Sequence, residues 1–335
     1  MFLKIITYAI GIIVAIPVLL WFAIRGIFTG SWKLLGFVCQ RQYRELKRLC
    51  EHGTADELQS FLTACPGARE YVVYARQDRT TSILTSLFRL PAPLDVAGQA
   101  NNLAVIPVLL ANGASPEIRS VSAKLSPAEE AIGNPEKMRT LCGGKTWWKE
   151  CSARNDVLQT GEPRGIVWNV MRGARLSIYD DLCSVRFLRL PKVIKEFICR
   201  FGIQEGQRTE FHALLKQSTP QERNRIATQR FHSSFGHRSV SLQKEFEEMM
   251  QALEMSLQPL PPVDNEAMER LEYSTSLMDR AKMLELLDTL FTQEQQFALL
   301  DTLTRKPQPN INREHIEDTV DLLLCSILKQ AGDKV

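Results

Sequence analysis

The feature that most constrains this chain is an uncharged stretch of twenty residues near its beginning, Ile5–Ile24. As a helix rising about 1.5 Å per residue, it is about 30 Å long, which matches the hydrocarbon thickness of a bilayer. A helix is the single segment that satisfies its own backbone hydrogen bonds in lipid. Trp21 and Trp32 suit an interfacial aromatic belt. We therefore predict a transmembrane anchor over residues 1–30 and a juxtamembrane segment over residues 31–42.

Two other interpretations of this stretch stay open. A cleaved signal peptide needs a shorter apolar run and a cleavage site between small residues. The run instead ends in Trp21-Phe22-Ala23-Ile24-Arg25. A buried core helix has a similar apolar composition. The length of the run and its lack of charge favour the spanning helix over both alternatives.

The positive charge beside the anchor predicts its orientation. Residues 1–50 contain seven Lys/Arg and one acid, and six of these bases, Arg41 and Arg44 among them, follow the apolar run. Because Lys and Arg are enriched in cytoplasmic loops, we expect a single-pass protein with its N-terminus outside and its body in the cytoplasm. In a bacterium this membrane is the inner one. Arg41 and Arg44 are expected at the membrane interface, beside anionic lipid headgroups.

The rest of the chain has the composition of a globular body. Hydrophobic residues make up 44% of the chain and charged residues 24%, which excludes wholesale disorder. The residues after position 50 carry a net charge of −3, so a nucleic-acid partner is not expected. The eight cysteines show no CxxC pair and no regular framework, which favours reduced thiols in a core.

A phrase in residues 93–116 recurs 34 residues later along the chain. In its first copy, Pro93-Leu94-Asp95-Val96-Ala97 opens a helix, Asn102-Leu103 leads into a second helix, and Asn112-Gly113-Ala114 ends that second helix. Pro127 and Ala131 stand 34 residues after Pro93 and Ala97, and Asn134-Pro135 opens the second helix of the copy. The pattern predicts successive helical hairpins.

This pattern resembles the ankyrin repeat, whose first helix opens on Thr-Pro-Leu-His-x-Ala, with Asp95 here in place of His. Weaker matches of apolar spacing lie 48 residues before and 88 residues after the first copy. The family interval is about 33 residues, so insertions are expected near residues 69–90 and 143–180. We expect degenerate ankyrin-like repeats over residues 43–203. A generic bundle of helical hairpins is the alternative, because amphipathic helix pairs give similar spacing.

The resemblance implies a helical solenoid that binds another protein through segments projecting to one side. In the best copy this segment is Ser115–Ser126, where Glu117 and Arg119 suit a polar interface rim. Trp147 and Trp148 are candidates for its apolar centre, because aromatic residues contribute much of the energy of interfaces. The alternative for both tryptophans is a place in the core under a long loop.

The remaining residues, 204–335, predict a helical C-terminal domain. Helices are expected from Pro220, over Val240–Leu257 and, after a cap at Asn312, over Arg313–Lys329. The stretch Met283–Leu303 is amphipathic, and a proline-rich segment near residues 258–263 is expected to be a linker. With no alternating strand pattern anywhere, the fold class is predicted to be all-α.

The sequence contains no catalytic, metal-binding or cofactor signature. His232 and His237 are five residues apart, which suits neither one face of a helix nor one face of a strand. The phrase Gly143-Gly144-Lys145-Thr146 imitates a phosphate-binding loop, but the required upstream glycine is replaced by Met138. Neither a metal ion nor a cofactor is expected.

These observations favour a membrane-anchored adaptor that binds a protein partner noncovalently at the cytoplasmic face. Two alternatives stay open. One is an enzyme, such as a bacterial effector, with an unrecognised site in residues 205–335 or at their junction with the repeats. The other is a membrane-tethered toxin inhibitor or immunity protein. Converging polar groups with perturbed titration in a cleft are the feature that favours an enzyme.

Overall fold

The computed structural model describes residues 41–73, 90–120, 123–149, 157–228, 239–263, 266, 271, 279–305 and 312–333. All regular secondary structure in these ranges is helical, so the predicted all-α class is confirmed. The predicted anchor Ile5–Ile24, with Trp21 and Trp32, lies outside the described residues. Within the described ranges, no helix has the length and apolar character needed to cross a bilayer.

The chain divides into two compact units, Met1–Ala114 and Ser115–Val335. This division lies inside the range predicted for the repeats, 43–203. The predicted domain limits therefore stay predictions.

Short helices with a shared apolar core form the first unit. They are residues 41–52, α2 (Ala55–Ala64), α3 (Pro66–Val73), α5 (Pro93–Gln99), the 3-10 turn η2 (Leu103–Val105) and α6 (Ile106–Ala111). Thr54 caps α2 in a capping box with Glu57, and Asn102 donates from Nδ2 to the Gly53 carbonyl at 2.9 Å. Leu109 of α6 is buried, whereas the neighbouring Leu110 is only partly buried.

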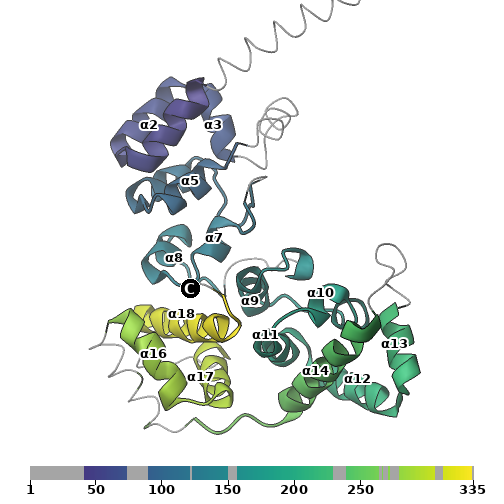
Figure 1. Ribbon diagram of the computed structural model, residues 1–335. Coiled ribbons are helices and arrows are strands. Elements are labelled where there is room, and N and C mark those ends of the chain that lie inside the picture. Colours follow the sequence, from purple (N-terminus) through teal and green to yellow (C-terminus); the bar gives the residue numbers. More distant parts are fainter. Residues whose placement is uncertain are drawn as a thin grey trace, which may run out of the picture. The chain divides into compact units, whose positions relative to one another are not determined.

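The second unit contains the remaining helices. They are α7 (Pro127–Glu130), α8 (Pro135–Leu141), η3 (Val157–Gln159), α9 (Pro163–Met171), η4 (Ile178–Leu182), α10 (Val185–Leu188), α11 (Lys192–Phe197), η5 (Ile198–Gly202), α12 (Glu205–Gln217), α13 (Pro220–Thr228), α14 (Ser239–Leu257), α16 (Arg280–Leu290), α17 (Gln293–Arg305) and α18 (Arg313–Gln330). Helix α14 packs on α11 and α12, and α18 packs on α16 and α17 (Figure 1).

Capping side chains set the helix beginnings that the sequence predicted. Ser126 caps α7, Asn134 caps α8 and Asn312 caps α18, and each accepts a hydrogen bond from a backbone N–H in the first turn. Helix α13 begins at Pro220 as expected. The amphipathic stretch Met283–Leu303 is interrupted between α16 and α17, because the backbone is extended at Phe291, the residue that follows α16.

Three helices end in turns of the same type, which follow one another at intervals of thirty residues. Gly113, Gly143 and Gly173 follow α6, α8 and α9 with φ angles of 95°, 58° and 91°, which favour glycine. In each case the N–H after the glycine bonds a carbonyl five residues back, as in the Schellman motif. The bonds are Ala114 N to Leu109 O at 3.0 Å, Gly144 N to Arg139 O at 3.4 Å and Ala174 N to Asn169 O at 3.0 Å. The expected insertion over residues 143–180 thus contains a helix and turn of the same kind.

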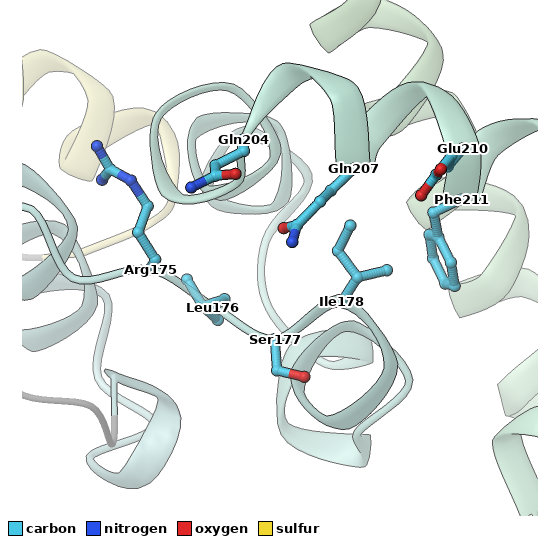
Figure 2. Close-up of a pocket in the computed structure, with 8 residues that line it drawn as sticks. All are labelled: Arg175, Leu176, Ser177, Ile178, Gln204, Gln207, Glu210 and Phe211. Atoms are coloured by element: carbon cyan, nitrogen blue, oxygen red, sulfur yellow. The ribbon is translucent and has the colours of Figure 1, made fainter.

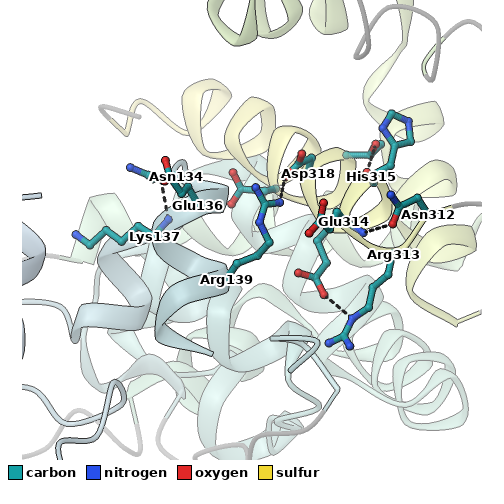
Figure 3. A network of polar contacts seen from close by, with 12 residues as sticks. Asn134, Glu136, Lys137, Arg139, Asn312, Arg313, Glu314, His315 and Asp318 are labelled. Carbon is teal, nitrogen blue, oxygen red and sulfur yellow. Dashed lines mark hydrogen bonds and ion pairs between the residues drawn. The ribbon is translucent and has the colours of Figure 1, made fainter. Parts of the chain in front are cut away.

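Polar contacts hold α18 to its neighbours in the second unit. Arg139 of α8 donates from Nη1 to Asp318 Oδ1 at 2.6 Å, and both residues are half-buried (Figure 3). One turn further along α18, Asp321 is buried, pairs with Arg280 of α16 and accepts a hydrogen bond at 3.1 Å from the Gly133 backbone N–H. Asp318 is half-buried and Asp321 is fully buried, whereas the two arginines are similarly accessible, so the two pairs form a matched comparison.

The six cysteines of the described residues are not in disulfide bonds. Cys50, Cys183, Cys199 and Cys325 are buried, and Cys65 and Cys142 are partly buried. Burial raises the pKa of Cys183 to about 11 and that of Cys50 to about 12, so these thiols stay protonated and poorly nucleophilic near neutral pH. The expectation of reduced core thiols agrees with these positions.

Candidate functional site

The residues predicted at the membrane interface are only partly described. Arg41 and Arg44 are exposed on the helix formed by residues 41–52. Trp21 and Trp32 lie outside the described residues. Contact with lipid therefore stays a prediction for all four side chains.

The predicted polar rim is engaged within the protein. Glu117 pairs with Arg172 at 2.9 Å, and the side chain of Arg172 is fully buried. The Arg172 guanidinium also lies 4.9 Å from the centroid of the Trp168 ring. Arg119 is partly buried. The interactions of Glu117 hold its segment against α9, which indicates a structural role for this carboxylate.

The two tryptophans expected at the centre of a binding surface are buried. Trp147 is 1% exposed and Trp148 is 6% exposed. The Trp147 ring stacks on Trp168 with a centroid distance of 5.2 Å and meets Trp148 edge-on at 5.2 Å. The core alternative is therefore the correct one, because burial removes the large apolar area of the three rings from water. We do not assign partner binding to Trp147 or Trp148.

An open pocket in the second unit is the better candidate site (Figure 2). Its volume is about 430 Å³. The residues that line it come from an extended segment before η4 and from the first half of α12. They are Arg175, Leu176, Ser177, Ile178, Gln204, Gln207, Glu210 and Phe211.

The first wall of the pocket follows the glycine turn at the end of α9. Its side chains alternate, with Arg175 and Ser177 exposed and Leu176 and Ile178 buried. The Leu176 backbone N–H donates to the Gly202 carbonyl at 3.1 Å. A Cβ on Gly202 would lie 2.9 Å from Leu176 Cδ1, so glycine permits this close approach.

Two π-helical turns frame this wall. Ser177 caps η4 through its Oγ, which accepts from the Asp180 N–H at 3.4 Å, and Ile178 is the first residue of that turn. At the end of η5, the Phe201 carbonyl accepts from Arg175 Nη1 at 3.2 Å. The Ala174 carbonyl accepts from the same nitrogen at 3.2 Å. π-Helical turns are rare in proteins but frequent at functional sites. The Phe201 and Ala174 carbonyls together hold the Arg175 guanidinium in place.

Helix α12 supplies the opposite wall. Gln207, Glu210 and Phe211 recur at the three- and four-residue spacing of a single helix face, and Gln204 precedes the helix. Phe211 is buried and forms part of an apolar floor. One turn beyond it, Leu214 is 41% exposed, which extends the apolar surface away from the pocket.

The chemistry of this pocket suits binding. It offers a cation in Arg175, an anion in Glu210, two side-chain amides and an apolar floor. The lining contains no histidine, cysteine or lysine, and its one hydroxyl, that of Ser177, caps η4. The Ser177 hydroxyl also donates from Oγ to Asp180 Oδ2 at 3.1 Å, within the same turn, and Asp180 does not line the pocket. Among the described residues, no group of His, Cys, Asp and Glu side chains is placed to hold a metal ion.

The other phrases singled out in the sequence carry no reactive arrangement in the described residues. Gly143-Gly144-Lys145-Thr146 forms the turn after α8, in keeping with the rejection of a phosphate loop. His212 lies 3.4 Å from Glu254, and this contact lowers the pKa of the Glu254 carboxyl. His232 and His237 lie outside the described residues.

None of the eight lining residues was singled out by sequence reasoning. One signal was available, because Val170-Met171-Arg172-Gly173-Ala174 repeats the ending Leu110-Ala111-Asn112-Gly113-Ala114 sixty residues later. Comparison of the chain with protein-family models, with curated proteins and with solved structures found no match.

Proposed function

We propose that this protein is a membrane-anchored adaptor that binds another protein in the pocket between Arg175–Ile178 and α12. The observation that carries this proposal is the lining of the pocket, which combines hydrogen-bonding side chains with an apolar floor. Protein-binding sites share this combination of apolar anchors and a polar rim.

The ankyrin-like interpretation supports the same function. Helices α5 and α7 begin with proline at N1, and the second helices α6 and α8 end in glycine turns of one geometry. The turn after α9 adds a further unit thirty residues on. Repeats of this size stack to build a shared core and use one side for binding. We infer that degenerate repeats form the scaffold and that the pocket lies at its junction with the C-terminal helices.

Placement at the membrane rests on the N-terminal sequence. The uncharged run Ile5–Ile24 has the length of a spanning helix, and the bases that follow it favour a cytoplasmic body. In this proposal Trp21, Trp32, Arg41 and Arg44 lie at the interface with lipid. The adaptor then holds its partner beside the cytoplasmic face.

Site-specific photo-crosslinking tests this function. A photoreactive phenylalanine analogue is placed at Gln207 in the full-length, membrane-bound chain, and the control places it at Gln221. Both glutamines are exposed, but only Gln207 lines the pocket. We expect a covalent adduct with another protein from position 207 and none from position 221.

The two alternatives give different outcomes in this experiment. Equal adducts from both positions, or no protein adduct at position 207, contradict the adaptor. An adduct with a small metabolite alone favours the enzyme. A toxin inhibitor also binds a protein. Identification of the crosslinked protein as a toxin therefore distinguishes this alternative from a general adaptor.

A further inference from the structure

We propose that the pocket takes an extended peptide segment of the partner in which an acidic side chain lies close to an apolar one. The carboxylate pairs with Arg175, and the apolar side chain sits against Leu176, Ile178 and Phe211. This inference rests on the proposed function, since it names the chemistry of the partner at the same site.

Arg175 is prepared for a carboxylate by its own hydrogen bonds. Its Nη1 donates to the Ala174 and Phe201 carbonyls, each at 3.2 Å. A guanidinium has five N–H donors, so the edge formed by Nε and Nη2 remains for a ligand. This edge matches the two oxygens of a carboxylate. No ion pair between described residues involves Arg175, and its side chain is exposed.

The remaining polar groups favour a peptide over an isolated anion. Figure 2 shows the Gln204 side chain directed toward Arg175 and Glu210 at the other end of the pocket. Side-chain amides donate and accept, which suits the backbone N–H and C=O groups of an extended segment. The Glu210 carboxylate repels a doubly charged phosphate, so it favours the singly charged carboxylate. Because Arg175 is positive and Glu210 is negative, the two ends of the pocket differ in charge, and a bound segment is expected to take one orientation.

The floor of the pocket accounts for the apolar side chain of the segment. Leu176, Ile178 and Phe211 are buried side chains whose outer atoms form this floor. The volume of about 430 Å³ lies within the range of sites that enclose a small group. Leu214, exposed one turn along α12, offers a second apolar contact to a longer segment.

A peptide selection tests the proposal directly. The full-length chain in detergent micelles is immobilised and used to select from a displayed library of random nine-residue peptides. We expect enrichment of sequences that place Asp or Glu within a few residues of Leu, Ile, Val or Phe. With Arg175→Glu, we expect the acidic preference to disappear and Lys or Arg to replace it. The matched control is Arg186→Glu, at an exposed arginine of α10 that does not line the pocket.

The affinity of selected peptides measures how much the acidic side chain contributes to binding. For the best selected peptide, replacing its acid by the corresponding amide is expected to weaken binding about 10-fold or more, the usual worth of a charge-assisted hydrogen bond. Arg175→Gln is expected to weaken the acidic peptide similarly and to leave the amide peptide unchanged. Enrichment without an acid, or an acidic preference that survives Arg175→Glu, overturns the proposal.

Three further outcomes test this inference separately from the adaptor function. A Gln207 adduct whose contact segment in the partner lacks an acid overturns the peptide chemistry and leaves the adaptor standing. Vesicles containing phosphatidylserine that bind through Arg175, with no peptide enriched, identify the pocket as a headgroup site and overturn the inference. Recovery of the acidic–apolar pattern in the selection supports it even when no cellular adduct forms, in which case the adaptor alone fails.

Discussion

Replacing Trp147 by alanine is expected to lower the free energy of unfolding of the second unit by about 3–5 kcal/mol, the usual cost of truncating a fully buried large aromatic side chain. Trp147 is 1% exposed and packs against two other indole rings. Its removal leaves a cavity that Trp148 and Trp168 cannot fill without losing their own contacts. The rigid geometry of the cluster makes collapse around the cavity difficult.

Pulse proteolysis of the full-length chain in a urea series measures this loss. The conservative variant Trp147→Phe keeps an aromatic ring beside Trp168 and is expected to lose clearly less stability. Leu214→Ala, at an exposed position of α12, is the control and is expected to change stability by about 0.5 kcal/mol or less. A loss below about 1 kcal/mol for Trp147→Ala contradicts the core assignment.

The second large effect is expected at Asp321. Asp321→Ala leaves Arg280 without its buried partner and the Gly133 N–H without its acceptor. Breaking a buried ion pair on one side typically costs about 3–5 kcal/mol. Asp318→Ala is the matched control, because Asp318 lies on the same helix and pairs with Arg139, but with 37% of its side chain exposed. That half-buried pair is expected to contribute about 0–1 kcal/mol.

Urea unfolding of the two variants compares these costs directly. The structure predicts a much lower midpoint for Asp321→Ala and a midpoint near wild type for Asp318→Ala. Equal urea midpoints for the two variants would show that the Arg280–Asp321 pair contributes no more to stability than the Arg139–Asp318 pair. The double variant Arg280→Met with Asp321→Leu removes both charges and is expected to recover much of the loss.

Local signals in the sequence were sufficient for the fold class and for many helix beginnings. Proline at N1 and a side-chain acceptor before it fix the start of a helix through atoms within one turn, as at Ser126-Pro127 and Asn134-Pro135. The break between α16 and α17 had a local signal too, because Thr292 and Gln295 form a capping box, with hydrogen bonds of 2.8 and 3.3 Å. The apolar periodicity on both sides concealed it.

The candidate site depended on contacts that no local pattern contains. Glu117 and Arg172 are 55 residues apart, so their ion pair follows only from the tertiary fold. Because of this pair, Glu117 has a structural role and not the expected role at the rim of an interface. Arg175 and Phe201 are 26 residues apart, and their hydrogen bond depends on a π-helical turn that sequence spacing does not specify. The tryptophans were equally compatible with an interface and a core, because aromatic side chains are enriched in both.

We propose that the pocket beside α12 holds a protein partner at the membrane. The most direct measurement is the amount of the Gln207-crosslinked protein that sediments with membranes from cells producing wild type, Gln207→Trp or Gln221→Trp. A tryptophan at position 207 fills the mouth of the pocket, whereas the same change at position 221 leaves it open. We predict that only Gln207→Trp reduces the sedimented partner, about 10-fold or more, the factor that corresponds to about 1.4 kcal/mol of binding energy. We predict also that all three chains stay in the pellet after alkaline carbonate washing. An unchanged amount of partner with Gln207→Trp, or release of the full-length chain by carbonate, would contradict the account.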